Sequence, residues 1–211
     1  MKSKIILQLM ANLHAPIYAS RIRELVPRII SHLCEGNRVL DVGCGYGALG
    51  KALLDSPGLP KGIMIDGLEK IKRNKQLINI YEYNGVNIPF PDNTYDVVIL
   101  ADVLHHEPDL DRLISECIRV SCKLLIIKDH KLCGPLSQFR LQFIDWAANI
   151  PYGIPCLYQY YTTDQWICLR GRHGLNLIDE TNSMNLYPPI INWIFGRKLQ
   201  YMCVLGCSKF N

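Results

Sequence analysis

The fold is decided by the stretch VLDVGCGYGALG, residues Val39 to Gly50. The apolar residues before Gly43 predict a strand over residues 38–42, and those after Gly47 predict a helix over residues 48–54. The glycines then form the turn between strand and helix. A turn of this kind directs the backbone amides at the start of the helix toward a polar or anionic ligand. The stretch therefore predicts a ligand site at the carboxyl end of a strand.

Two binding patterns fit this turn. Residues 45–50 match the dinucleotide pattern GxGxxG, and Asp66 lies 21 residues past Gly45, near the spacing expected for a ribose-binding acid. Residues 41–47 equally match DxGxGxG. The carboxylate of Asp41 would crowd a dinucleotide pyrophosphate, but it suits a ligand with a cationic amine, such as S-adenosylmethionine.

Strand and helix patterns alternate along most of the chain. Strands are predicted over 38–42, 63–65, 78–83, 97–101, 123–127, 175–178 and 201–205, and helices over 21–33, 48–54, 68–77, 110–120, 136–148 and 163–172. This alternation indicates an α/β fold: a doubly wound, mostly parallel, Rossmann-like seven-stranded sheet with helices on both faces. We predict a single domain, 1–211, with an N-terminal helical cap over 1–36, a substrate-side lid insertion over 129–161 after the fifth strand, and an apolar linker over 186–195.

Composition excludes several classes of protein. The 23 basic and 19 acidic residues give a net charge of +4, and the basic run over 70–75 is interpreted as a solvated helix face, so no nucleic acid partner is expected. The nine cysteines form no CxxC pair, which disfavours a zinc set. Gln8 and Asn12 interrupt the apolar stretch over 5–13, and no apolar run approaches the length of a membrane span, so we expect a cytoplasmic protein.

A second block, IPFPDNTYDVVILADVLHH from Ile88 to His106, follows the glycine turn. With both blocks in this order, the sequence from Val39 to Asp129 resembles the class I S-adenosylmethionine-dependent methyltransferases, most closely the small single-domain type. The resemblance implies S-adenosyl-L-methionine as the cofactor. The chain departs from the family where Val120 is followed directly by Ser121, without the usual proline and glycines before the fifth strand.

The resemblance also implies which residues contact the cofactor. The methionine end would be surrounded by Asp41, Gly43, Cys44 and Gly45, and bordered by Ala101 and Asp102 after the fourth strand. Asp66 would end the second strand and accept hydrogen bonds from the ribose, and Gly67 and Leu68 would flank the adenine. Asn84 stands where the family often has an aspartate that accepts from the adenine amine, and its amide oxygen can still accept.

Open parallel sheets bind ligands beyond the carboxyl ends of their strands, so the substrate should lie near His106, His130 and the insertion. If the acceptor must lose a proton, His130 is the first candidate base, oriented by Asp129, and His106 is the second. Either histidine could instead satisfy a backbone group. Asp102 and Asp129 could begin a metal site, but no third oxygen ligand is identifiable, and no metal is predicted.

Aromatic residues mark the insertion, where Phe139, Phe143 and Trp146 fall on one helical face. Such a stripe favours lid packing, or an apolar or aromatic acceptor if it lines the pocket. The predicted function is methyl transfer to oxygen, nitrogen or carbon of a small, apolar or aromatic acceptor. The alternatives are an RNA or protein methyltransferase, a non-catalytic S-adenosylmethionine-binding partner subunit, and a nicotinamide-dependent reductase. The oligomeric state is left open.

Overall fold

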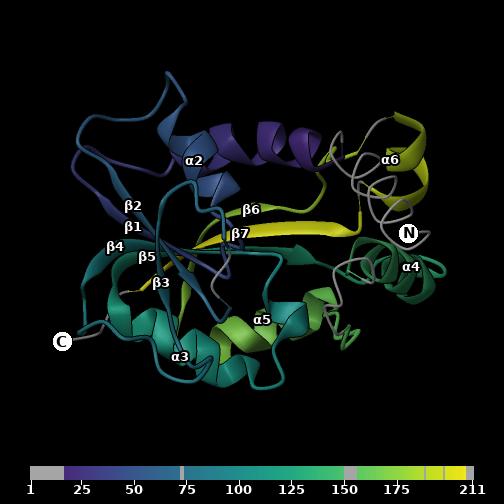
Figure 1. Ribbon diagram of the computed structural model, residues 1–211. Helices are drawn as coiled ribbons and strands as arrows, with labels where there is room; N and C mark the ends of the chain where they lie inside the picture. Colours follow the sequence, from purple (N-terminus) through teal and green to yellow (C-terminus); the bar gives the residue numbers. More distant parts are fainter. Residues whose placement is uncertain (1–16, 72–73, 150–155, 188, 197, 208–211) are drawn as a thin grey trace.

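The computed structural model describes residues 17–71, 74–149, 156–187, 189–196 and 198–207 of the 211. Its centre is one seven-stranded sheet in the order β3-β2-β1-β4-β5-β7-β6 (Figure 1). The strands are β1 (Arg38–Val42), β2 (Met64–Glu69), β3 (Asn79–Glu82), β4 (Tyr95–Ala101), β5 (Ser121–His130), β6 (Asn176–Thr181) and β7 (Gln200–Gly206). Neighbouring strands pair in parallel except at β7, which runs antiparallel to both β5 and β6. The predicted doubly wound α/β sheet is confirmed.

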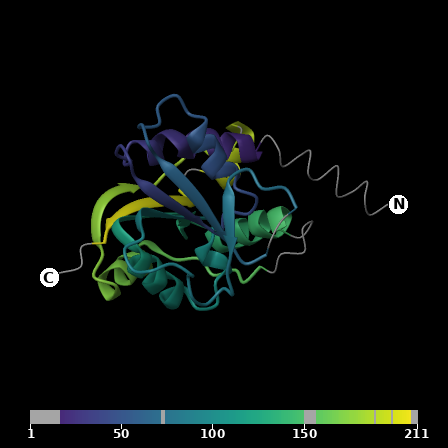
Figure 2. The same cartoon turned by 60° about the vertical axis from the view of Figure 1, so that its left-hand side comes forward.

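Helices cover both faces of the sheet. They are a helix over residues 17–30, α2 (Ala48–Leu54), α3 (Leu110–Val120), α4 (Ser137–Asn149), α5 (Thr163–Arg172) and α6 (Pro189–Phe195), with a short 3-10 helix η1 (Leu104–His106). The helix over 17–30 and α2 lie on one face, and α3 and α5 lie on the other (Figures 1 and 2). Helices α4 and α6 pack together at the end of the sheet where β5 finishes.

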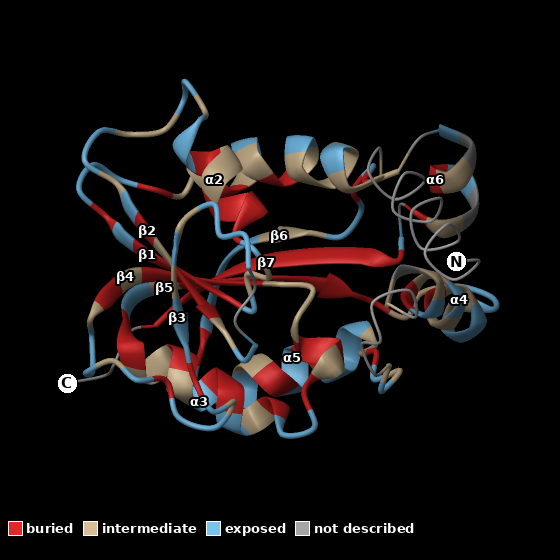
Figure 3. Cartoon of the chain, viewed as in Figure 1, coloured by how far each residue is buried: buried red, intermediate tan, exposed pale blue. Residues whose placement is uncertain are grey.

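The two faces of the sheet hold separate apolar layers, because successive side chains of a strand point to opposite sides. In β4, Ile99 packs in the layer that contains Leu25 of the helix over 17–30. The next residue, Leu100, packs in the layer that contains Ile114 of α3. All four side chains are buried, and buried residues fill most of the central strands β1, β4, β5 and β7 (Figure 3). This packing fixes the carboxyl ends of the parallel strands as one rigid edge.

The predicted helix over 68–77 is wrong. Strand β2 continues to Glu69, and residues 70–71 and 74–78 form bends and extended chain. Leu68 is fully buried in the core, and its carbonyl accepts a 2.8 Å hydrogen bond from the Gly43 N–H. The backbone at this point is thus committed to strand geometry, which outweighs the helical propensity of the basic run.

Three smaller features also bear on the predictions. The first helix spans residues 17–30 and not 21–33, and the expected linker over 186–195 contains α6. The shortened turn after Val120 is confirmed, because β5 begins at Ser121.

Residues 1–16 and 150–155, in the predicted cap and lid, lie outside the described residues, and the division into cap, domain and lid stays a prediction. Among the described helices, none combines the length and the apolar composition of a membrane span.

Candidate active site

The candidate site begins at the glycine turn after β1. Gly43 has a φ of +69°, and a Cβ built there would lie 2.6 Å from Cγ2 of Val103. Gly47 has a φ of +84°, and its Cβ would lie 2.5 Å from Cγ1 of Ile78. Only glycine has both the backbone freedom and the small size that these positions need. The predicted turn is confirmed, and it forms a cradle of backbone at the tip of β1.

Asp41 lies at the base of this cradle. Its side chain is 2% exposed, and its Oδ2 atom has no hydrogen-bond partner among the described residues. Burial raises the pKa of Asp41 to about 7, although the Arg21 guanidinium acts in the opposite direction. A buried carboxylate oxygen without a donor fits a ligand that brings its own cationic N–H group.

The acid at the tip of β2 is Glu69 and not Asp66. Asp66 was expected to end the strand, but it lies three residues before the end and pairs with Leu40 of β1. The Asp66 carboxylate already accepts from the Asn79 side chain at 2.9 Å and from the Tyr95 hydroxyl at 3.1 Å. Glu69 Oε2 accepts from the Gly45 N–H at 2.7 Å, which places this carboxylate beside the glycine turn.

The residues expected around the adenine also lie elsewhere than predicted. Leu68 is a core residue, and a Cβ at Gly67 would lie 2.5 Å from Cys44 Sγ, so both belong to the sheet interior and not to a ligand surface. Asn84 is exposed, and its Oδ1 accepts from the N–H groups of residues 86 and 87, both at 2.9 Å. That oxygen stabilises its own loop, so the structure does not support the predicted role of Asn84 toward the adenine.

Ala101 ends β4 as predicted, and Asp102 follows it with a left-handed φ of +60°. Two cations hold the Asp102 carboxylate: Arg21 Nε lies 2.6 Å from Oδ2, and Lys128 Nζ contacts Oδ1. Burial disfavours the ionised carboxylate, but these cations outweigh burial and keep the pKa of Asp102 well below its usual range. Arg21 also donates to the Ala101 carbonyl at 3.1 Å, so the helix over residues 17–30 closes the site from one side.

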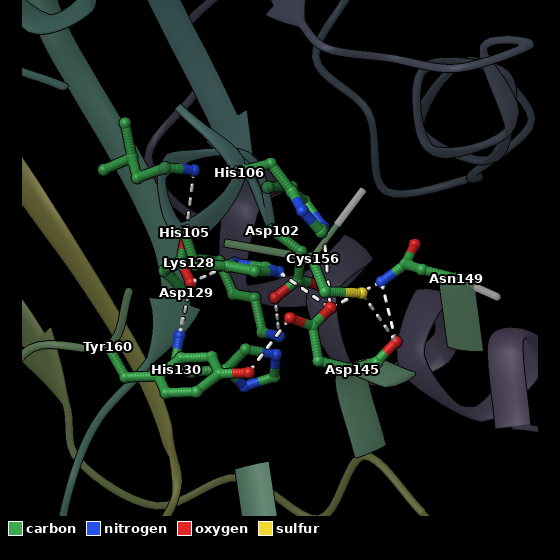
Figure 4. A network of polar contacts seen from close by, with 12 residues as sticks. Asp102, His105, His106, Lys128, Asp129, His130, Asp145, Asn149, Cys156 and Tyr160 are labelled. Carbon is green, nitrogen blue, oxygen red and sulfur yellow. Dashed lines mark hydrogen bonds and ion pairs between the residues drawn. The ribbon is translucent and has the colours of Figure 1, made fainter. Parts of the chain in front are cut away.

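A cluster of histidines and aspartates lies beyond the ends of β4 and β5 (Figure 4). His105 is at its centre: Nδ1 lies 2.6 Å from Asp129 Oδ1, and Nε2 lies 3.7 Å from Asp145 Oδ1. Burial disfavours the imidazolium of His105, but Asp129 outweighs burial and raises the pKa to about 10. The ring centroid of His105 lies 4.1 Å from that of His106 and 4.8 Å from that of His130.

The structure corrects the predicted pair of Asp129 and His130. Asp129 orients His105, and toward His130 it accepts only from the backbone N–H, at 2.7 Å. Burial, with the charges of His105 and Lys128, lowers the pKa of His130 to about 4. His130 is therefore neutral at pH 7 and a weak base.

The cluster also contains residues that the sequence interpretation did not select. Asp145 of α4 is buried, its Oδ2 accepts from the Tyr160 hydroxyl at 2.9 Å, and its Oδ1 lies 3.7 Å from His106 Nε2. A lone acid within the apolar run FIDWAA was the available signal for Asp145. The side chains of Phe139, Phe143 and Trp146, on the same helix, are all exposed.

A small pocket opens beside this cluster. His105, Asp129 and His130 line its polar side, and Leu104, Leu110 and Trp166 line its apolar side. In this conformation the pocket is too small to admit a ring, and only its mixed polar and apolar lining bears on the kind of acceptor.

The fold and the site define a class of protein: a doubly wound α/β domain with a glycine turn after β1, Asp41 near the end of β1 and Glu69 at the end of β2. Residues 40–123 match the family model described as a methyltransferase domain. Over 145 residues the chain is 33% identical to a demethylmenaquinone methyltransferase of Symbiobacterium thermophilum, covering 61% of this chain and 56% of that protein. It is 34% identical over 89 residues to a ubiquinone biosynthesis O-methyltransferase of Coxiella burnetii, covering 39% of this chain and 38% of that protein.

Solved structures show the same fold. An S-adenosylmethionine-dependent methyltransferase from Aquifex aeolicus matches with a TM-score of 0.61 and 15% identity, covering 96% of this chain and 98% of that one. The predicted resemblance is thereby confirmed: residues 40–123 match a methyltransferase domain, and the chain has the fold of the class I S-adenosylmethionine-dependent methyltransferases. The family and the fold imply S-adenosyl-L-methionine as the cofactor. The matched region spans about half the length of the first curated relative.

Proposed function

We propose that this domain transfers a methyl group from S-adenosyl-L-methionine to a small apolar or aromatic acceptor. The observation that carries the proposal is the buried Asp41 carboxylate, which has an oxygen without a donor among the described residues and lies directly before the glycine turn. When bound, the cofactor supplies an electrophilic methyl group on a sulfonium.

Residues at the tips of β1, β2 and β4 would hold the cofactor. Asp41 would accept from its amine, and the backbone of the glycine turn, with Gly43 and Gly45, would lie against its methionine end. Glu69, in place of Asp66, would accept from the ribose hydroxyls, since a carboxylate has about four acceptor sites and the N–H groups of Gly45 and Lys70 occupy two of them. Asp102, fixed by Arg21 and Lys128, borders the side that faces the acceptor.

The His/Asp cluster would act on the acceptor. The imidazolium of His105 lines the pocket and favours an anionic acceptor oxygen, because opposite charges stabilise each other strongly in a buried site. His106 does not line the pocket, but its side chain is 22% exposed and its ring centroid lies 4.1 Å from that of His105, and we assign it to take the proton that the acceptor loses. His130 and Asp129 position these groups.

The acceptor that best fits is a hydroxylated aromatic or quinol ring. The pocket is apolar on one side and polar on the other, and the two curated relatives above are named for quinone substrates. Binding of such a ring requires the pocket to open, since Leu104, Trp166 and His105 are buried in this conformation.

The test is direct detection of the product. The purified chain is incubated with S-adenosylmethionine and a naphthoquinol, a catechol, an RNA or a peptide, and the products are analysed by mass spectrometry. We expect methylated small rings, and His106→Gln should lower turnover about 100-fold or more while cofactor affinity is kept. His173→Gln, which changes a histidine that pairs with Asp111 between α5 and α3 and does not line the pocket, is the matched control. Methylation of RNA or peptide alone would contradict the proposal.

A further inference from the structure

We propose that His105, His106 and Asp145 form a binding site for one divalent transition-metal ion. The Nε2 atoms of His105 and His106 each lie 3.7 Å from Oδ1 of Asp145, and the three ligand atoms all lie within 4.8 Å of one another. Metal–ligand distances of about 2.0–2.1 Å place the ligand atoms of a tetrahedral zinc site about 3.4 Å apart. The three side chains therefore need only small movements to share an ion.

The donor set indicates which ions fit. Two imidazole nitrogens and one carboxylate oxygen suit Zn²⁺, Co²⁺ or Fe²⁺, whereas Mg²⁺ and Ca²⁺ prefer oxygen ligands alone. Three protein ligands also leave a coordination position open, which is the arrangement of catalytic and not of structural zinc sites.

The groups behind these ligands have the arrangement that metal ligands need. His105 Nδ1 lies 2.6 Å from Asp129 Oδ1, which fixes the ring so that Nε2 points toward Asp145. Asp129 is itself held by the backbone N–H groups of Leu104, at 3.0 Å, and of His130, at 2.7 Å. A carboxylate behind a histidine ligand is the common outer-shell arrangement of metal sites.

Asp145 is held in the same way. Its Oδ2 accepts from the Tyr160 hydroxyl at 2.9 Å, and its Oδ1 contacts the Asn149 side chain (Figure 4). The partly exposed His106 gives an ion a route to two otherwise buried ligands.

A second triad, His105, Asp129 and His130, is also close enough to share an ion. It is less suitable, because Asp129 Oδ1 already accepts from both His105 Nδ1 and the His130 backbone, and His130 Nδ1 lies 3.3 Å from the Gln200 side chain. An ion there would break contacts that hold the ends of β4 and β5. The ion at His105, His106 and Asp145 leaves these contacts intact.

The metal site does not depend on the proposed methyl transfer. Its use in catalysis does: with the ion bound, His105 and His106 would be ligands and would no longer act as imidazolium and base, and the ion would take their place by polarising the acceptor oxygen in its open position.

The experiment uses the full chain, treated with a chelator and dialysed, then titrated with CoCl₂ and followed by visible absorption. We expect one Co²⁺ per chain, displaced by ZnCl₂. His106→Gln and Asp145→Asn should weaken Co²⁺ binding about 100-fold or more, and Asp129→Asn, which acts through His105, about 10–100-fold. His173→Gln should bind Co²⁺ as the unmodified chain does.

S-adenosylmethionine affinity, measured calorimetrically on the same samples, shows that each variant is folded. A folded chain that binds no Co²⁺ at about 1 mM would overturn the proposal. Equal Co²⁺ binding by the unmodified chain, His106→Gln and Asp145→Asn would also overturn it. Loss of cofactor binding with Co²⁺ binding retained would instead contradict the proposed function.

Discussion

Lowering the pH from 7.5 to 5 is expected to weaken S-adenosylmethionine binding by roughly 50-fold, because Asp41 must be ionised to accept the cofactor's amine. Burial raises the pKa of Asp41 to about 7 against the opposing charge of Arg21, and Glu69 raises it further. About 1% of the carboxyl is then ionised at pH 5 and about three quarters at pH 7.5, while the amine, with a pKa near 8, is mostly protonated at both. The difference corresponds to about 2.3 kcal/mol of binding free energy.

Isothermal titration calorimetry in two buffers of different ionisation enthalpy measures both the affinity and the protons released. Near pH 6 binding should release close to one proton from Asp41, and Asp41→Asn should bind weakly with no pH dependence between 5 and 7. If the unmodified chain bound equally well at pH 5 and 7.5, or if Asp41→Asn kept the same slope, the assignment of Asp41 would be refuted.

The same pKa of Asp41 predicts a stability effect without cofactor. The unfolded carboxyl has a pKa near 4 and the folded one about 7, so the folded state binds more protons between these values. The stabilisation that comes from protonated Asp41 is therefore fully present below pH 4. It is lost as the pH rises to 7, which lowers the free energy of unfolding by up to about 4 kcal/mol. Urea denaturation should therefore show that the stability of Asp41→Asn relative to the unmodified chain is higher at pH 8 than at pH 4.

The remaining predictions concern the tips of the strands. Glu69→Gln should weaken cofactor binding about 10–100-fold by calorimetry, whereas Asp66→Asn should change it less than about threefold; the reverse order would restore Asp66 as the ribose acceptor. Gly43→Ala adds a clash to an unfavourable φ and should cost about 2–4 kcal/mol in thermal unfolding, against about 1 kcal/mol for Gly36→Ala, where a Cβ meets open space. Equal losses would show that no clash exists at Gly43. Arg21→Met removes one of two cations from half-buried Asp102 and should cost about 1–3 kcal/mol in urea denaturation; a neutral result would mean that Lys128 alone is sufficient.

Most of the sheet could be predicted from the sequence because local pattern and tertiary environment agree there. The stretch around Asp41 and Gly43 specifies a strand, a turn and a helix within 17 residues, and the apolar run of β4 requires burial on both faces. The helix predicted over 68–77 is wrong because the residues have helical propensity, whereas the contacts that fix the backbone there come from residues distant in the sequence. Leu68 is held by the core and by a hydrogen bond from Gly43.

The site shows the same limit. The tip of β1 was predicted correctly, but the acid on β2 depends on where that strand ends, and that end is set by pairing with β1 and β3 and not by spacing from the glycines. The side chain that pairs with Asp129 is His105, because the 3-10 helix η1 places the His105 ring beside the Asp129 carboxylate. His130 contacts that carboxylate only through its backbone N–H. Arg21 and Asp145 come from helices whose packing against the site depends on tertiary contacts, although the lone acid in the apolar run FIDWAA was a local signal for Asp145.

The most direct measurement is a crystal structure of the chain with S-adenosylhomocysteine, the product of the cofactor. The account predicts that its amine lies within hydrogen-bond distance of Asp41 Oδ2 and its ribose hydroxyls within hydrogen-bond distance of Glu69. A nucleoside bound elsewhere, or a ribose bound by Asp66 with Glu69 turned away, would contradict it.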